Sequence, residues 1–295
     1  MKLPDLRNHG EERGSDMTDT IKLRAPYERA GVPVPEHPAE LLPVCLPHSN
    51  ENGEKMRPAV IICPGGGYDY CSDRESVPVA MRFAGYGVQA FVLYYNCKTP
   101  FPTNLLELAA AVAYVREHAA EYEIDPGRIA VCGFSAGAHL AGSLAVYWNR
   151  PLLRDLLGDS EAYRPNGQIL CYPVISGGES AHRGSIVNLI GEQDANDFAC
   201  EPNAAVSLEK QVSADTPPCF LWSTSDDNTV PIRNSVLYLG ALAAYGVPFE
   251  SHIYPHGAHG LALSDETTAM GDWHLNPVCA PWFAACIAWI RRVYQ

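Results

Sequence analysis

A serine between two glycines, in the segment Gly133-Phe134-Ser135-Ala136-Gly137, carries the clearest chemical signal in the sequence. A serine hydroxyl attacks a carbonyl carbon only when it is exposed, correctly aimed and relieved of its proton. Glycines two residues before and after the serine let a strand turn abruptly into a helix, so that the serine oxygen projects from a strained corner. The spacing therefore predicts that Ser135 is the nucleophile of an acyl-transfer reaction.

A run of glycines, Pro64-Gly65-Gly66-Gly67-Tyr68, lies upstream of this serine and directly after an apolar stretch. Glycines let the chain approach a ligand closely and present bare backbone amides. The negative oxygen formed in acyl transfer needs two such donors, one from the residue after the nucleophile, here Ala136, and one from a loop after an earlier strand. We therefore expect the glycine run to complete an oxyanion hole. A phosphate-binding loop is the alternative, but the Gly-x-x-x-x-Gly-Lys pattern is absent and no lysine follows the glycines.

A serine nucleophile needs a base, and His259 is the strongest candidate among the ten histidines. It lies in Tyr254-Pro-His-Gly-Ala-His-Gly260, a glycine-flanked loop just after the last predicted strand. Catalytic groups gather at that edge of an α/β sheet. His256, three residues earlier, is the rival base. His139 lies in a segment that looks buried, and we expect it in the core or just behind the site.

An acid that orients the base is expected in Thr224-Ser-Asp-Asp-Asn-Thr-Val-Pro231, which again follows an apolar strand. Asp226 and Asp227 are both candidates. Either one, followed by His259, gives the chain order serine, acid, histidine that accompanies a nucleophile on a strand–helix corner. Two adjacent aspartates at a strand end can also cap a helix, so one can cap while the other orients the base.

These residues need elements that bring them together, and the chain alternates short apolar runs with helical patterns. We expect strands at residues 59–63, 88–95, 128–132, 168–172, 218–224 and 249–254, and helices at residues 77–86, 105–122, 136–148, 232–245 and 277–292. Such alternation predicts an α/β fold with a mostly parallel central sheet and helices on both faces. Each chemical segment follows a strand, so all of them should meet at the carboxyl edge of the sheet.

The same pattern predicts one α/β domain over residues 20–295, preceded by a flexible leader at residues 1–19. Prolines interrupt the apolar stretches between residues 21 and 47, which suits edge strands and loops. Residues 174–217 contain no convincing strand. That stretch is expected to form either a small cap over the carboxyl edge of the sheet or a long connection.

Composition narrows the function further. The 295 residues are 47% hydrophobic, which allows a large core, and carry a net charge of −13 with only 21 Lys and Arg. A nucleic-acid partner is therefore not expected. The ten cysteines show no Cys-x-x-Cys spacing or zinc pattern, and no apolar run resembles a signal peptide or reaches membrane-spanning length. We expect a cytoplasmic enzyme with a small-molecule ester substrate, no metal, no organic cofactor and no membrane partner; a homo-oligomer stays open.

Four segments together resemble the α/β-hydrolase superfamily, and more closely its esterase/lipase branch of bacterial acetyl-xylan, feruloyl and related acetyl esterases. They are Pro64-Gly-Gly-Gly-Tyr68, Ile124-Asp-Pro-Gly-Arg-Ile-Ala-Val-Cys-Gly-Phe-Ser-Ala-Gly-Ala-His-Leu140, Asp227-Asn-Thr-Val-Pro231 and His256-Gly-Ala-His-Gly-Leu261. The resemblance spans roughly residues 55–292. Pro64 stands where the more familiar His-Gly-Gly-Gly run has histidine, a departure that this branch often shows.

The resemblance implies roles for single residues. An aspartate three residues before the Val of Val-Pro favours Asp227 over Asp226, and a histidine followed by Gly-Leu favours His259 over His256. The oxyanion donors would be the amides of Gly66, Gly67 and Ala136. The implied activity is serine-dependent hydrolysis of short acyl esters, acetyl esters above all, of carbohydrates. An arylformamidase or other amidase, a small serine peptidase with the same triad, and a non-catalytic binding protein on this fold are the alternatives.

Overall fold

The computed structural model describes residues 20–51, 53 and 55–294, so the predicted leader at residues 1–19 lies outside the described residues. Its centre is an eight-stranded sheet with the order β1-β2-β4-β3-β5-β6-β7-β8. The strands are β1 (Ile21–Lys22), β2 (Glu40–Val44), β3 (Arg57–Cys63), β4 (Gln89–Tyr94), β5 (Ile124–Phe134), β6 (Gly167–Cys171), β7 (Cys219–Thr224) and β8 (Phe249–Tyr254). The six strands predicted from the sequence are the last six of these.

The last six strands are parallel to one another, whereas β1 and β2 run antiparallel at one edge. β2 contains Pro43, which faces Phe91 of β4 in the register. Proline cannot donate to a strand ladder, so it is confined to positions at or near an edge. The proline-rich start of the chain therefore forms the antiparallel border of the sheet, as the sequence predicts.

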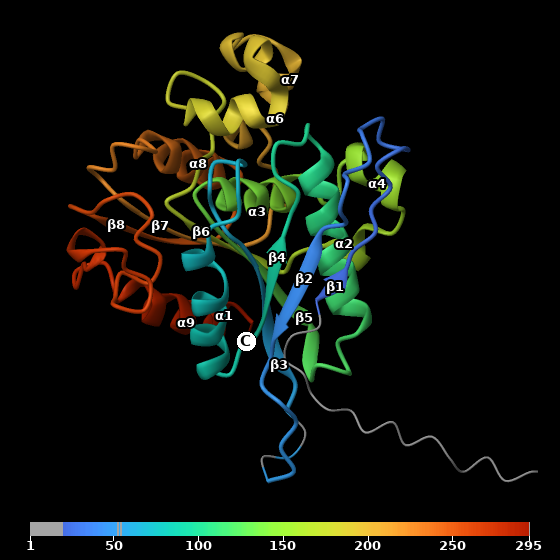
Figure 1. Cartoon of the computed structure of the whole chain (residues 1–295), viewed down its shortest axis with the longest axis vertical. Helices are drawn as coiled ribbons and strands as arrows, with labels where there is room; N and C mark the ends of the chain where they lie inside the picture. Colours follow the sequence, from blue (N-terminus) through green and yellow to red (C-terminus); the bar gives the residue numbers. More distant parts are fainter. Residues whose placement is uncertain (1–19, 52, 54, 295) are drawn as a thin grey trace, which may run out of the picture.

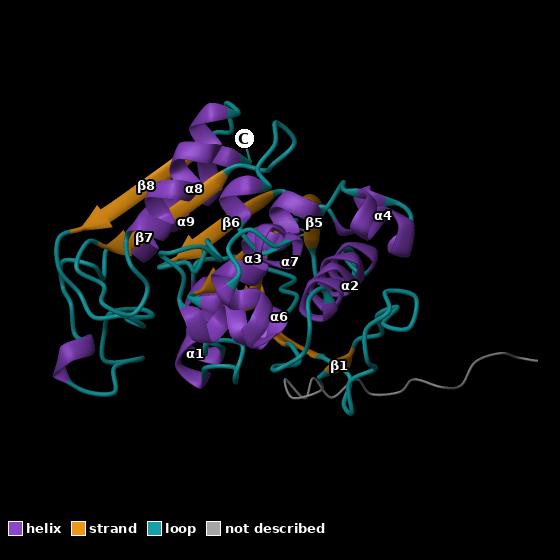
Figure 2. Ribbon diagram, turned by 90° about the horizontal axis from the view of Figure 1, so that it is seen from above, coloured by secondary structure: helices purple, strands orange, loops and turns teal. Residues whose placement is uncertain are grey.

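Helices cover both faces of the sheet, seen from above in Figure 2. They are α1 (Val77–Gly85), α2 (Thr103–Glu117), α3 (Ala136–Tyr147), α4 (Pro151–Leu157), α5 (Ser160–Tyr163), α6 (Arg183–Asn196), α7 (Glu201–Ala205), α8 (Arg233–Ala244) and α9 (Trp282–Val293), with short 3-10 turns η1 (Asp73–Glu75), η2 (Leu208–Lys210) and η3 (Asp272–His274). The sequence predicts α1, α2, α3, α8 and α9, but not α4, α5, α6 or α7.

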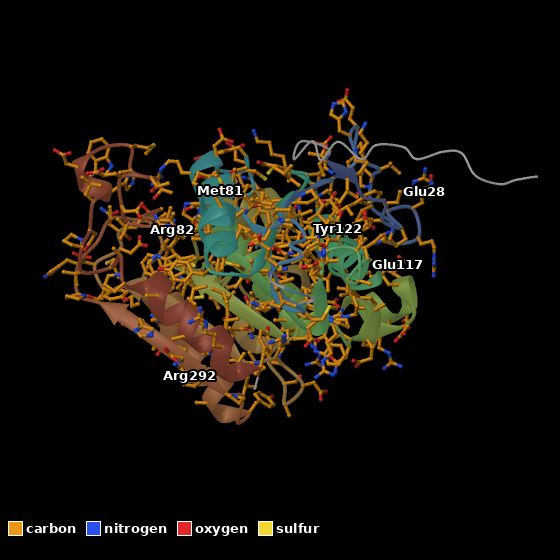
Figure 3. The ribbon with its side chains drawn as sticks, turned by 90° about the horizontal axis from the view of Figure 1, so that it is seen from below. Glu28, Met81, Arg82, Glu117, Tyr122 and Arg292 are labelled. Atoms are coloured by element: carbon orange, nitrogen blue, oxygen red, sulfur yellow. The ribbon has the colours of Figure 1, made fainter. Side chains whose placement is uncertain are left out.

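The strand side chains divide between two buried clusters, as the two-residue period of a strand requires. In β3, Ile61 belongs to the buried cluster that also contains side chains of α2, α3 and α8, whereas Val60 and Ile62 belong to the cluster that contains side chains of α1 and α9. Figure 3, seen from below, shows Arg82 of α1 well apart from Glu117 of α2. Both faces of the parallel sheet are thus buried, which explains why its strands read as continuous apolar runs.

Two helices differ from their predicted bounds for local reasons. α2 ends at Glu117, before the predicted end at residue 122, because the backbone leaves the helical conformation at His118. Glu123, with a positive φ of 54°, then turns the chain into β5. α9 begins at Trp282, five residues later than predicted. The side-chain oxygen of Asn276 accepts hydrogen bonds from the amides of Val278 and Cys279, both at 3.1 Å, so that this stretch forms a capped turn.

The 174–217 segment has no strand and instead holds α6, α7 and η2. In Figure 1, α6 and α7 lie at the top of the molecule, beyond α3 and α8. α6 is broken at Gly191, whose φ of 81° and ψ of 163° are not helical. In the part of the chain that the structure describes, no helix is long and apolar enough to cross a membrane.

Candidate active site

Ser135 occupies the corner between β5 and α3, with φ 53° and ψ −116°. A non-glycine residue in this region stores backbone strain of about 1–3 kcal/mol. The Ser135 amide donates to the carbonyl of Cys171 at 3.0 Å, which fixes the corner against β6. The side chain thereby projects from the carboxyl edge of the sheet at the start of α3.

The two flanking glycines are required by close contacts. A Cβ atom on Gly133 would lie 2.1 Å from the carbonyl oxygen of Gly137. A Cβ atom on Gly137 would lie 2.0 Å from the carbonyl oxygen of Cys63. Because the strand, the corner and the glycine loop pass this close, no larger side chain fits at either position.

His259 lies between the serine and an aspartate. Its Nε2 atom is 2.8 Å from Ser135 Oγ, and its Nδ1 atom is 2.6 Å from Asp227 Oδ2. A carboxylate only accepts hydrogen bonds, so Nδ1 carries a proton and Nε2 is left to accept the serine proton. Asp227 is itself fixed, since its Oδ1 atom accepts from the amides of Thr229 and Val230, both at 2.9 Å.

The two rival residues form a pair of their own. His256 Nδ1 lies 2.9 Å from Asp226 Oδ2, and Asp226 Oδ1 accepts from the Gly257 amide at 2.9 Å. The His256 side chain is 85% exposed, whereas that of Asp227 is 1% exposed. Asp227 alone therefore fixes a turn and contacts His259. The sequence by itself allows these two roles to fall on different aspartates.

The expected oxyanion donors are Gly66 and Gly67 of the glycine loop and Ala136, the residue after Ser135. Gly66 and Gly67 have positive φ values of 120° and 67°, and Ala136 is the first residue of α3. Within the described residues, none of these three amides has a hydrogen-bond partner. Free amides at the start of a helix and in a glycine loop are suited to bind a negative oxygen.

A buried carboxylate that the sequence did not reveal supports this loop. Glu75 is 4% exposed, and its Oε2 atom accepts from the Gly65 amide at 2.8 Å. Its Oε1 atom accepts from the Tyr172 hydroxyl at 2.7 Å, and that hydroxyl accepts from the Ala262 amide at 2.9 Å. The Tyr172 ring also contacts the His259 ring edge-on, with centroids 5.1 Å apart. Glu75 thus connects the glycine loop with the surroundings of His259.

A pocket of about 730 Å³ opens over Ser135 and His259. Many of its lining residues carry polar or charged side chains, and Val187 and Met270 are the aliphatic ones. The lining residues are Gly66, Gly67, Asp69, Tyr70, Ser72, Arg74, Glu75, Ser135, His182, Arg183, Gly184, Val187, Asn188, Thr229, His259, Gly260, Met270 and His274. Residues 182–188 all belong to the 174–217 segment, which therefore supplies one wall of the pocket.

Two further histidines surround the site. His182 lines the pocket, and its Nδ1 atom is 2.8 Å from Ser185 Oγ. Burial, together with the nearby His259, lowers the pKa of His182. His139 is fully buried behind the serine and bonded to the Tyr68 hydroxyl at 2.8 Å. The sequence predicts His139 at this place but gives no sign of His182, because no regular pattern marks the start of α6.

Most of the chain matches the model of one known protein family. The model of the BD-FAE family matches residues 44–242. The chain belongs to the BD-FAE family. The match contains the glycine loop, Ser135 and Asp227, and His259 lies beyond its end.

Curated relatives of this BD-FAE chain include xylan-degrading enzymes. It is 38% identical to endo-1,4-beta-xylanase B of Butyrivibrio fibrisolvens over 225 residues. The aligned region covers 73% of this chain and 34% of that protein. It is 30% identical to an acetylxylan esterase of Xylanibacter ruminicola, over 75% of this chain and 43% of that protein. The chain thus spans between a third and a half of the length of these relatives.

Solved structures match over nearly their whole length. An acetyl ester-xyloside bifunctional hydrolase from Caldicellulosiruptor lactoaceticus has 37% identity and a TM-score of 0.73, covering 91% of this chain and 96% of that one. The chain therefore has the α/β-hydrolase fold that the sequence predicts. In the described part of the chain, no group of three or more His, Cys, Asp or Glu side chains is placed to hold a metal ion.

Proposed function

We propose that this chain removes short acyl groups, acetyl above all, from the hydroxyl groups of small carbohydrates. The hydrogen-bonded series Asp227–His259–Ser135 at the base of the pocket carries this proposal. A long-chain lipid needs a large cleft lined by aliphatic side chains, whereas the aliphatic side chains that line this pocket are Val187 and Met270. The two relatives named for acetyl esters of xylan or xylosides support the same substrate class.

The reaction runs in two acyl transfers. His259 Nε2 accepts the proton of Ser135 as Oγ bonds to the ester carbonyl carbon, and Asp227 stabilises the charged imidazole. The amides of Gly66, Gly67 and Ala136 donate to the carbonyl oxygen while it bears negative charge. His259 then gives its proton to the alcohol oxygen as the ester bond breaks.

Water completes the cycle. It attacks the acyl group on Ser135 while His259 accepts one of its protons, and the returned proton restores the serine hydroxyl as the carboxylic acid leaves. The hydrogen bond from the Ser135 amide to the Cys171 carbonyl holds Ser135 in its strained backbone conformation. Oγ therefore points in the same direction in both steps.

A substrate series tests this function. We expect the value of kcat/KM to be highest for p-nitrophenyl acetate and to fall steadily from butyrate to octanoate, with acetate released from acetylated xylo-oligosaccharides. A preference for octanoate would contradict the short-acyl assignment. Faster cleavage of N-formyl aromatic amines than of acetate esters would instead identify an arylformamidase, and preferred cleavage of peptide bonds a peptidase.

We also propose a location and a charge preference for this enzyme. The ten cysteines are all free thiols, which supports a reducing, cytoplasmic location. Assembly into a homo-oligomer is tested by light scattering during size-exclusion chromatography. A neutral substrate suits the net charge of −13, which offers no attraction to nucleic acid.

A further inference from the structure

A second hollow of about 730 Å³ lies beside the pocket over Ser135, between residues 98–101 and the helices α6 and α7. Val187 and Asn188 of α6 line both hollows. The ion pair between Asp69 and Lys98 also spans them, because Asp69 lines the first and Lys98 the second. The two hollows therefore form one groove along α6. We call the part beyond Val187 and Asn188 the outer groove.

The walls of the outer groove are held by hydrogen bonds. The Phe101 amide donates to the Leu189 carbonyl at 2.9 Å, which fastens residues 98–101 to α6. The buried Asn203 side chain of α7 donates to the Gly177 carbonyl at 3.0 Å. Asn188 donates to the carbonyl of Gly67 at 2.9 Å, so α6 is fixed to the glycine loop as well. A groove built this way needs little rearrangement to receive a ligand.

The chemistry of the outer groove favours a neutral ligand with many hydroxyl groups. Phe101 and Ile190 give it an apolar surface, on which the C–H face of a sugar ring can pack. The carboxylates of Asp194 and Glu201 line it and have no hydrogen-bond or ion-pair partner among the described residues. A carboxylate accepts hydrogen bonds from hydroxyl groups and repels an anion. The one lysine of the groove, Lys98, already pairs with Asp69.

We propose that the outer groove is a second carbohydrate subsite, which binds the next sugar unit of a neutral oligosaccharide whose acetyl ester lies at Ser135. The inference rests on the proposed function, since it names the alcohol part of that same substrate. The enzyme is then selective for acetylated oligosaccharides over acetylated monosaccharides, and it discriminates against chains that carry a uronic acid at the neighbouring unit.

The experiment compares kcat/KM for p-nitrophenyl acetate, acetylated xylose, acetylated xylotriose and acetylated xylotriose that bears a glucuronic acid. We expect the wild-type value to be about threefold to tenfold higher for the neutral trisaccharide than for the monosaccharide, the effect of one or two hydrogen bonds. In the double variant Asp194→Ala/Glu201→Ala, which removes both acceptors, this ratio falls towards one. Its activity on p-nitrophenyl acetate and acetylated xylose stays unchanged, because neither reaches the outer groove.

A charge reversal adds a sharper comparison. Glu201→Lys should improve the use of the glucuronic acid substrate relative to the neutral trisaccharide by about threefold. Glu192→Lys is the matched control, since Glu192 is an exposed residue of α6 that lines neither hollow, and it should leave this ratio unchanged. Melting temperatures of all variants show whether they fold as the wild type does.

The outcomes separate this inference from the proposed function. Equal wild-type values for acetylated xylose and xylotriose, or equal effects of the two lysine variants, would overturn the subsite while leaving acetyl-sugar hydrolysis intact. Hydrolysis of p-nitrophenyl acetate without any release of acetate from the sugars would overturn the proposed function, and the subsite with it.

Discussion

Asp226 is hydrogen-bonded to His256, with 2.9 Å between Oδ2 and Nδ1. Their neighbours in sequence, Asp227 and His259, form a second and shorter pair, with 2.6 Å between Oδ2 and Nδ1. Only the second pair continues to Ser135. Two Asp–His pairs of the same chemistry therefore stand side by side, one on the surface and one in the site.

This duplication allows a matched test of the orienting acid. Asp227→Asn should lower kcat on p-nitrophenyl acetate by about 10³- to 10⁴-fold, because the amide favours the wrong histidine tautomer. Asp226→Asn makes the same chemical change one residue away and should alter kcat less than about twofold, since exposed pairs contribute little. A large loss in Asp226→Asn with an active Asp227→Asn would reverse the assignment.

The chain order and the strand ends explain why so much of the site could be predicted. The glycine loop, Ser135 and His259 each follow a strand directly, and parallel strands bring their carboxyl ends to one edge. Only the resemblance to known esterases favours Asp227 over Asp226. Nothing in the two adjacent aspartates says which carboxylate turns inward, because that depends on the turn at Thr229 and Val230.

The supporting residues could not be found in this way. Tyr172 is the last residue of the predicted strand 168–172, so the sequence already indicates its place at the carboxyl edge of the sheet. Its partner Glu75 lies 97 residues earlier in a short 3-10 turn, and no periodic pattern marks such a turn. Likewise α6 begins at a loop whose position over the pocket depends on tertiary contacts.

Glu75 and Tyr172 are predicted to act on the glycine loop and the base. Glu75→Gln should lower kcat by about tenfold to a hundredfold with KM changed less than about twofold, because a glutamine cannot accept from both Gly65 and Tyr172 and the oxyanion donors shift. Tyr172→Phe should do the same more weakly. Steady-state kinetics of both variants and of the double variant measure this.

The double variant Glu75→Gln/Tyr172→Phe tests whether the two side chains act together. Since the two side chains form one network, their effects should be less than additive in free energy. Additive losses, or a rise in KM at constant kcat, would show that Glu75 does not position the loop. Unfolding curves for each variant separate a positioning effect from a general loss of stability.

His139 is expected to make the protein sensitive to mild acid. Burial lowers the pKa of His139 from 6.5 to about 4, so the folded chain holds it neutral while the unfolded chain takes up a proton below about pH 6.5. Stability is therefore complete above that pH and is lost progressively as the pH falls towards 4. The loss by pH 5 should be about 2 kcal/mol.

Urea unfolding of wild type and His139→Gln at pH 7.5 and pH 5 checks this. Burial raises the pKa of Glu107 to about 7, an effect of the opposite sign, but Glu107 is present in both proteins and cancels in the comparison. The wild type should lose about 2 kcal/mol more than the variant on going to pH 5. Equal losses in the two proteins would contradict the prediction.

Cys97 should be the most reactive thiol. It is partly exposed, and its interaction with the neighbouring Cys71 side chain lowers the pKa of Cys97 while raising that of Cys71. Labelling by iodoacetamide follows the thiolate fraction. Cys71→Ala should therefore slow the labelling of Cys97 at pH 7.5 about fivefold, as read by peptide mass spectrometry.

Cys45→Ala is the control for this labelling. Burial raises the pKa of Cys45 to about 12, and its thiol bonds to the Ala90 carbonyl away from Cys97. Its removal should leave the rate at Cys97 unchanged. Faster labelling of Cys97 in Cys71→Ala would contradict the predicted direction of the pKa shift.

Covalent labelling of the serine oxygen tests most directly whether Ser135 is the nucleophile, because Oγ displaces fluoride from a fluorophosphonate and keeps the phosphonyl group. Incubation of wild type with a fluorophosphonate should add one label per chain, at Ser135, and abolish hydrolysis of p-nitrophenyl acetate. Ser135→Ala should keep the wild-type melting temperature within a few degrees, take up no label and lose about 10⁶-fold in kcat. An unlabelled wild type, or a Ser135→Ala variant that still hydrolyses the ester at the wild-type rate, would contradict the account.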